Sequence, residues 1–184
     1  MKTVQREELH DYVTYSEQRE ALREQVMAIK APRRIHLGEY LTFLFENADT
    51  MRYQVQEMMR AEQIVKETEI LHELQTYNEL LGGPGELGCT LLIEIDDAAE
   101  RDVKLREWKA LTDHLYVKVE GGDKIRASFD ARQVGEERLS SVQYLKFATG
   151  GRVPLAVGAD HPSLTVETEL TAAQQQALAS DLAS

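Results

Sequence analysis

The stretch FENADTMRYQVQEMMRAEQIVKETEILHELQTYN, residues 45–78, decides how the chain folds. Its apolar residues form two stripes with helical spacing, the second of which runs on to residue 81. The stripes consist of Met51, Val55, Met58 and Met59, and of Ile70, Leu74, Tyr77 and Leu81. On one straight helix, at about 100° per residue, they would lie roughly 90° apart. We therefore expect a helix that begins after Asp49 or Thr50 as its N-cap and kinks or breaks near residues 63–67.

The flanking sequence predicts helices in the first half of the chain and mainly strands in the second. A helix is expected over about residues 6–30, ended by Pro32, and an alternating strand over 41–45. Beyond the GGPGELG loop at 82–88, strands are expected at 90–95, 115–119, 124–130, 142–147 and 164–166, and helices at 97–111 and 171–182, the last with Thr171 as its N-cap. The prediction is an α+β fold. Its N-terminal helices, including a long kinked or broken one, pack on a mainly antiparallel sheet, and a helix ends the chain.

Length and composition fit one globular domain. The chain has 184 residues, of which 42% are apolar and 29% charged. We expect a single domain over 1–184, in which residues 1–81 are mostly helical with one strand or hairpin. Residues 89–184 are expected to be mostly β with two helices.

Charge and cysteine content exclude several classes of function. The formal net charge of -11 has the wrong sign for binding a phosphate backbone, so no nucleic-acid partner is expected. Cys89 is the only cysteine, which excludes an intrachain disulfide and a thiolate-rich zinc or iron–sulfur site within one chain. The N-terminus lacks an apolar signal region and no window approaches the roughly 20 apolar residues that span a bilayer. We expect a cytoplasmic protein that has no membrane partner.

The polar residues of the 45–78 stretch have specific hydrogen-bonding geometries, which ordinary exposed helix faces do not require. Tyr53, Glu57 and Arg60 share one helix face, opposite the methionine stripe. They form either an exposed ion pair or part of a site on a helix that is buried on both sides. Glu94 interrupts the apolar run TLLIEI and is either paired with Arg60 or Arg101 or exposed to solvent.

Two histidine motifs are candidates for metal binding or catalysis. Glu69-x-x-His72 has the spacing with which a carboxylate and an imidazole on adjacent helical turns bind one metal, but di-iron proteins use two such pairs. Glu69, His72 and His161 are therefore the candidate metal ligands, and a surface histidine is the competing interpretation of His72. The sequence Asp160-His161-Pro162 is expected in a turn and does not form a catalytic triad by itself. Cys89 is interpreted as a buried, inert thiol.

Several segments resemble a bacterial family known as a domain of unknown function. They are FENADTMRYQVQEMMRAE, HELQTYNELL, TLLIEI, VQYLKF and the late DHP, and the similarity runs nearly the full length of the chain. The resemblance implies a cytoplasmic, single-domain protein, often encoded beside rubrerythrin-like proteins and iron–sulfur oxidoreductases. In two places the chain departs from the family pattern, since Pro84 comes late and Gln143 stands where histidine is expected. The positions of interest that the resemblance implies are Glu46, Gln54, Glu57, Arg60, Glu73, Tyr77, Asn78, Glu94, Asp160 and His161.

Two functions follow from these observations. The first is an accessory or interaction protein of a redox system with iron–sulfur or di-iron partners, which predicts an exposed apolar or acidic patch and allows a homodimer. The second is a carboxylate-rich site for a metal or small molecule, whose cofactor the sequence leaves unknown. Its candidate residues are Glu46, Tyr53, Gln54, Glu57, Arg60, Glu73, Tyr77, Asn78 and Glu94. In a third interpretation, the polar residues join the long helix to the sheet and have a structural role.

Overall fold

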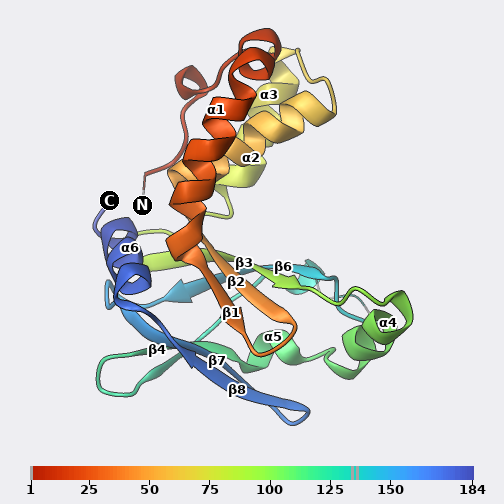
Figure 1. The fold of residues 1–184 in the computed structure, drawn as a ribbon, viewed down its shortest axis with the longest axis vertical. Helices are drawn as coiled ribbons and strands as arrows, with labels where there is room; N and C mark the ends of the chain where they lie inside the picture. The colour runs from red at the N-terminus through yellow and green to blue at the C-terminus, as the bar shows by residue number, and fades with distance from the viewer. Residues whose placement is uncertain (1, 134, 136) are drawn as a thin grey trace.

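The computed structural model, which describes residues 2–133, 135 and 137–184, has a helical arm standing on two β-sheets (Figure 1). The arm consists of α1 (Tyr12–Lys30), α2 (Ala48–Ala61) and α3 (Glu67–Asn78), together with the N-terminal segment and its short 3-10 turn η1 (Arg6–Glu8). The predicted α+β class with helices first and a C-terminal helix is confirmed.

The first helix begins later than predicted. It starts at Tyr12 and not near Arg6, because the Asp11 side chain accepts hydrogen bonds from the N–H groups of Val13 and Thr14. This is the geometry of an N-cap, which places the first helical residue directly after the aspartate. A second 3-10 turn, η2 (Ala31–Arg33), then follows α1 at Pro32.

The predicted break in the 45–78 stretch is confirmed, and the predicted N-cap is wrong. α2 ends at Ala61 and α3 begins at Glu67. Between them Gln63 has a φ of 53°, in the left-handed region that no helix continues through. The N-cap of α2 is Asn47, not Asp49 or Thr50, and its side chain accepts from the Thr50 N–H in a capping box.

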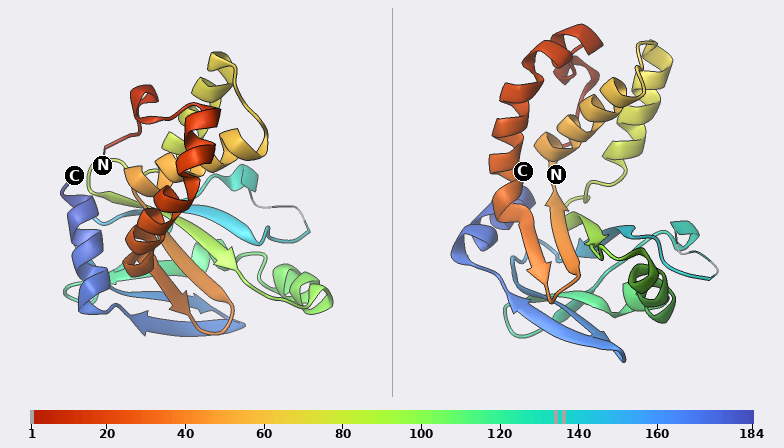
Figure 2. Two further views of the ribbon diagram at one scale, coloured as in Figure 1. Left: turned by 45° about the horizontal axis from the view of Figure 1, so that its top comes forward. Right: turned by 45° about the vertical axis from the view of Figure 1, so that its right-hand side comes forward.

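Two four-stranded antiparallel sheets replace the single sheet that was predicted (Figure 2). The arm-side sheet has the order β1 (Arg34–Leu37), β2 (Leu41–Glu46), β3 (Glu86–Ile93) and β6 (Val142–Ala148). The distal sheet has the order β5 (Lys124–Arg126), β4 (Leu115–Val119), β7 (Pro154–His161) and β8 (Leu164–Glu169). Between β3 and β4 lie α4 (Ala98–Glu107) and α5 (Leu111–His114), so the helix predicted over 97–111 is shorter than expected.

One strand was missed by sequence reasoning. Asp160 and His161 lie at the end of β7 and not in a turn. Gly158 weakens the strand pattern there, since glycine is rare in strand interiors. The structure explains the glycine, because a Cβ at this position would lie 2.3 Å from the Tyr116 ring.

The space between the sheets holds the main hydrophobic core. Phe43, Phe45 and Phe147 are fully buried there, with ring centroids 6.1–6.4 Å apart. The arm has a separate core of its own, made of Val4, Leu9, Met51, Val55, Met59, Ile64, Ile70, Leu74 and Leu81. The arm is therefore packed internally and joined to the sheets by other means.

A buried ion pair joins the base of the arm to the C-terminal helix α6 (Ala172–Leu182). Arg33 Nε and Nη2 donate to the two oxygens of Asp181 at 2.7 and 2.8 Å. Asn47 Nδ2 donates to the same carboxylate at 3.1 Å. Since Arg33 and Asp181 are 9% and 5% exposed, loss of either partner would leave a buried charge without its counter-ion.

Among the described residues, none of the helices combines the length and apolar character needed to cross a bilayer.

Candidate functional site

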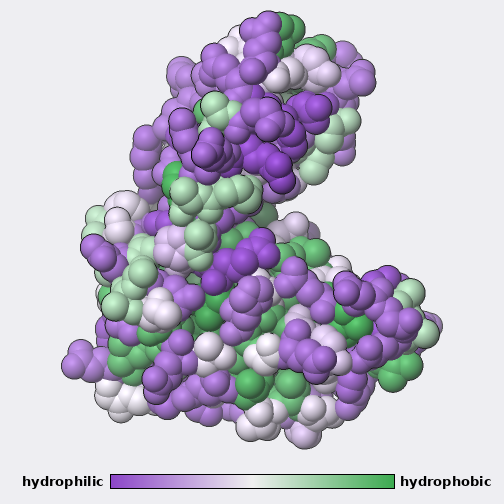
Figure 3. All heavy atoms as spheres, in the orientation of Figure 1, coloured by the Kyte–Doolittle hydropathy of each residue, from purple (hydrophilic) through white to green (hydrophobic). Residues whose placement is uncertain are grey.

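The outer face of the arm-side sheet, below the arm, carries polar side chains of β1, β2 and β3. Side chains alternate along each strand, so residues next to the buried core positions face the arm. Strand register aligns two rows across this face, Arg34–Leu44–Thr90–Tyr144 and His36–Thr42–Leu92–Val142. Figure 3 shows the surface hollowed between the arm and the sheets, on the right of the view. We refer to the space between this face and the arm as the arm–sheet cleft.

Glu46 ends β2, and its side chain is buried between α2 and β3. Its Oε2 accepts from the Thr50 hydroxyl at 2.5 Å and its Oε1 accepts from the Thr90 hydroxyl at 2.7 Å. The side chain is 4% exposed, and this burial raises the pKa of the carboxyl above its usual value. The two hydroxyls and the charge of Lys30 oppose that shift. Glu46 thus links α2 to β3 through one carboxyl group.

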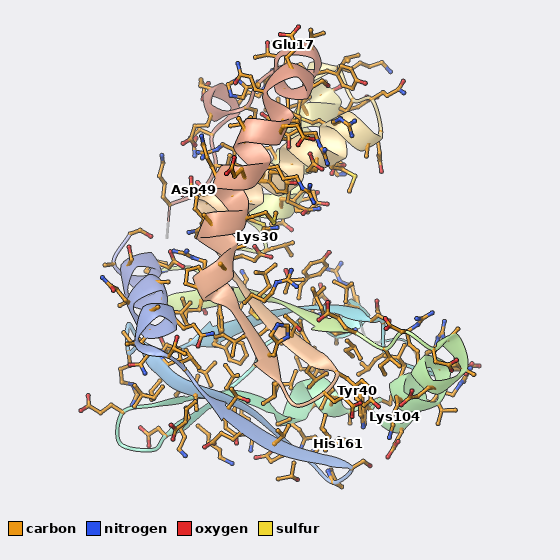
Figure 4. The ribbon with its side chains drawn as sticks, viewed as in Figure 1. Glu17, Lys30, Tyr40, Asp49, Lys104 and His161 are labelled. Atoms are coloured by element: carbon orange, nitrogen blue, oxygen red, sulfur yellow. The ribbon has the colours of Figure 1, made fainter. Side chains whose placement is uncertain are left out.

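Lys30 ends α1 at the point where the arm meets the sheets (Figure 4). Its ammonium lies 5.2 Å from the centre of the Tyr53 ring, a cation–π distance. Desolvation lowers the pKa of Lys30, while the charge of Glu46 acts in the opposite direction. Tyr53, a predicted site residue, packs against the C-terminal end of α1 and is 9% exposed.

Glu94 lies at the outer edge of the cleft and is exposed. The Thr42 hydroxyl donates to Glu94 Oε2 at 2.5 Å and lies 2.9 Å from His36 Nδ1. Because a hydroxyl has one proton, Nδ1 must be the donor of the second bond and carries hydrogen. The cation nearest to Glu94 is Arg34, at 4.0 Å, so both predicted partners, Arg60 and Arg101, are wrong. Glu94 follows β3 and is not part of a core strand.

A groove between α3 and β6 opens beside the cleft. It has a volume of about 700 Å³. It is lined by Thr76, Glu79, Leu80, Ser128, Phe129, Asp130, Arg132, Gln133, Tyr144, Leu145 and Lys146. Tyr144 is 40% exposed. Burial raises the pKa of Tyr77, another predicted site residue, and the phenol of Tyr144 contributes to that rise. The Gln54 side chain opposes the rise in the pKa of Tyr77. We call this feature the α3–β6 groove.

Glu57 pairs with a residue that the sequence did not suggest. Its carboxylate accepts two bonds of 2.8 Å from Arg19 and one of 2.6 Å from the Tyr15 hydroxyl, both on α1. The Arg19 guanidinium lowers the pKa of Glu57. Arg60, the expected partner on the same helix, is exposed. Of the three residues on this helix face, Tyr53 and Glu57 thus contact α1, and Arg60 is exposed to solvent.

Asn78 and one glutamine that was not predicted bind the N-terminal segment to the arm. The Asn78 amide accepts from the Val4 N–H and donates to the Val4 carbonyl, both at 2.9 Å. The Gln56 amide forms the same pair with His10, at 2.6 and 3.1 Å. Helical or strand spacing does not relate residues this far apart in the sequence. The only local indication is that Gln56 is a polar residue on an apolar helix face. Glu73 lies half-buried on α3.

The three candidate metal ligands are not brought together. Glu69 and His72 are exposed on α3, where Glu69 pairs with Lys66 at 3.2 Å. His161 lies in β7 of the distal sheet, at the lower edge of Figure 4, and packs edge-on against His114 at 5.1 Å. Over the part of the chain that the structure describes, no three His, Cys, Asp or Glu side chains gather in a way that could hold a metal ion.

The distal sheet has an ionic cluster of its own, centred on Asp160. This carboxylate accepts from Arg126 at 2.6 and 2.8 Å and from Lys124 at 3.2 Å. Arg126 is the largest influence that lowers the pKa of Asp160. Cys89 is fully buried, and desolvation raises the pKa of its thiol, in agreement with the inert thiol that was predicted. Neither Asp160 nor Cys89 faces the cleft.

We predict that Glu57→Gln lowers the free energy of unfolding by about 1–3 kcal/mol, because an amide replaces the charged acceptor of Arg19 and Tyr15. Urea unfolding measures this change. Glu73→Gln is the matched control and should change the stability by less than about 0.5 kcal/mol. Equal effects of the two substitutions would contradict a structural role for Glu57.

Glu46 should make stability depend on pH. Because the folded-state pKa is raised above the usual value of 4.5, the folded protein holds this proton more tightly than the unfolded chain. The corresponding stability is present below pH 4.5 and is lost as the pH rises through the folded-state pKa. The stability of the wild type relative to Glu46→Gln should therefore fall as the pH rises above 4.5 in urea titrations. A difference that stays constant or grows with pH would show that the pKa is not raised.

Comparison with known proteins agrees with the expected membership of a family of unknown function, while the neighbouring redox genes stay a prediction. A crystal structure of a novel protein of unknown function from Burkholderia pseudomallei K96243 is 28% identical, with a TM-score of 0.90, and the match covers 98% of this chain and 100% of that one. No curated protein matches the chain. The model of the family described as "Protein of unknown function (DUF3501)" matches residues 3–182. Since that match spans nearly the whole chain, the protein belongs to the DUF3501 family.

Proposed function

We propose that this protein is a cytoplasmic accessory protein of a redox system, which binds an iron–sulfur or di-iron partner protein through the α3–β6 groove. The observation that carries the proposal is the exposed aromatic ring of Tyr144 in a groove of about 700 Å³. Tyrosine is enriched among the residues that dominate binding energy at protein interfaces. Leu80, Phe129 and Leu145 line the same groove, so an apolar side chain of a partner would be removed from contact with water there.

The acidic residues of α3, next to the groove, favour a partner with a basic surface, although the groove itself is lined by both acids (Glu79, Asp130) and cations (Arg132, Lys146). α3 has acidic side chains at Glu67, Glu69 and Glu73, and Glu79 follows directly after the helix. Arg6 and Lys66 pair with Glu67 and Glu69, while Asp130 and, more weakly, Glu79 raise the pKa of Arg132 in the groove. Together with the net charge of -11, this distribution would attract a positively charged partner and speed its association. The redox identity of that partner rests on the family resemblance.

Binding to purified candidate partners tests the proposal. We expect an iron–sulfur oxidoreductase or a rubrerythrin-like protein from the same genome to bind in isothermal titration calorimetry. Tyr144→Ser should weaken that binding about tenfold or more, as loss of a buried aromatic anchor does. Leu155→Ser is the matched control, because Leu155 is 39% exposed on the distal sheet and Tyr144 is 40% exposed. Binding that responds equally to both substitutions, or no binding by the wild type, would contradict the proposal.

A small-molecule or metal site in the arm–sheet cleft is the second candidate, and it is favoured by the burial of Glu46, whose charge interacts with that of Lys30. Perturbed pKa values of an acid and a base in one place are typical of functional sites as well as of structural networks. Plasma mass spectrometry on protein purified without chelators tests the metal form of this candidate. Near-stoichiometric iron, manganese or zinc that disappears in Glu46→Gln would support it. Metal-free protein would leave the interaction function as the remaining proposal.

A further inference from the structure

β6 is the edge strand of the arm-side sheet next to the α3–β6 groove. Its odd-numbered residues face the core, and its even-numbered residues have their backbone N–H and C=O groups directed away from β3. An exposed edge of this kind is a template for another strand. The structure covers part of it, since Ser128 exchanges two backbone hydrogen bonds of 2.8 Å with Lys146.

A side chain takes the place of a strand at the next outward-facing residue. The Gln133 amide donates to the Tyr144 carbonyl at 2.8 Å and accepts from the Tyr144 N–H at 2.8 Å. A primary amide has the same donor and acceptor as a peptide group, so Gln133 makes the pair of bonds that a neighbouring strand would make. These two bonds connect β6 to a short 3-10 turn, η3 (Ala131–Gln133), and to no strand.

The surroundings of Tyr144 fit an extended peptide. An added strand would place alternate side chains toward the arm, over Tyr144 and beside Leu80, in the space of the groove. Glu79 lines the same groove, together with the cations Arg132 and Lys146. A peptide that has apolar side chains at alternate positions therefore complements the groove in shape, and one basic residue on the same face can pair with Glu79.

We propose that the partner protein inserts an extended segment beside β6, where it replaces the Gln133 amide and pairs with the backbone of Tyr144. This inference rests on the proposed function and specifies how the partner is recognised. Backbone pairing supplies the affinity in strand addition, and the side-chain pockets supply the specificity. Gln133 protects the edge until the partner arrives.

A blocked pentapeptide, acetyl-Lys-Thr-Val-Thr-Val-amide, is the probe, with isothermal titration calorimetry as the measurement. We expect it to bind the wild type and to bind Gln133→Ala roughly tenfold more tightly, because no amide then competes for Tyr144. Gln175→Ala is the matched control. Gln175 lies on α6, away from β6, and its amide also donates to a backbone carbonyl, that of Leu170. This control should leave the affinity unchanged.

N-methylation of the peptide separates strand pairing from side-chain contact. Methylation of the central valine removes the N–H that would donate to Tyr144 and should abolish binding, whereas methylation of the first threonine, whose N–H would face away from β6, should preserve it. Amide exchange by NMR gives a second readout, since the Tyr144 N–H should lose protection in Gln133→Ala and regain it when the peptide is added.

Strand addition is wrong if the unmodified peptide does not bind, if both methylated peptides bind alike, or if Gln133→Ala leaves the affinity unchanged. Should Tyr144→Ser still weaken a full-length redox partner in that case, the groove would remain the partner site without strand pairing. Conversely, the predicted peptide pattern without binding of any redox partner would support strand addition and overturn the redox assignment.

Discussion

The carboxyl group of Glu46, buried between the hydroxyls of Thr50 and Thr90, is the interaction on which the relation of arm and sheets depends. The arm and the sandwich of sheets have separate hydrophobic cores, so apolar packing alone does not fix one against the other. The next residue, Asn47, begins α2 and also donates to Asp181 of α6. Two consecutive side chains therefore connect α2, β3 and the C-terminal helix. A buried polar group is costly when it lacks a partner, so these contacts hold one geometry in preference to others.

This connection keeps the cleft and the groove open. The arm does not collapse onto the outer face of the arm-side sheet, where Arg34, His36 and Glu94 remain accessible. Glu57 shows the same principle within the arm, since its bonds to Arg19 and Tyr15 set the spacing of α1 and α2. Several of the candidate polar residues, among them Glu46, Glu57 and Asn78, thus make contacts that hold separate parts of the chain together. The surfaces that they hold apart are the better candidates for function.

Local signals predicted the elements well, and long-range pairing was beyond them. The break near Gln63 followed from the angle between two apolar stripes, which is a property of neighbouring residues. The partner of Glu57 lies 38 residues away on another helix, and nothing in the spacing of charges identifies it. Helical spacing favoured Arg60, because residues three apart share a face, yet Arg60 is turned to solvent. The division of the strands into two sheets likewise depends on tertiary packing. The contact between Gln133 and β6 was missed because a single side-chain amide does not produce the alternating pattern by which strands are recognised in a sequence.

Three side-chain amides, those of Gln56, Asn78 and Gln133, each hold a backbone by one donated and one accepted bond. Slow hydrolysis of such an amide to the acid would exchange the donor for a second acceptor. A carboxylate oxygen would then face a backbone carbonyl oxygen. Because both are acceptors and repel each other, one of the two hydrogen bonds would be lost. Hydrolysis of the Asn78 amide would therefore weaken the attachment of the N-terminal segment to the arm at Val4.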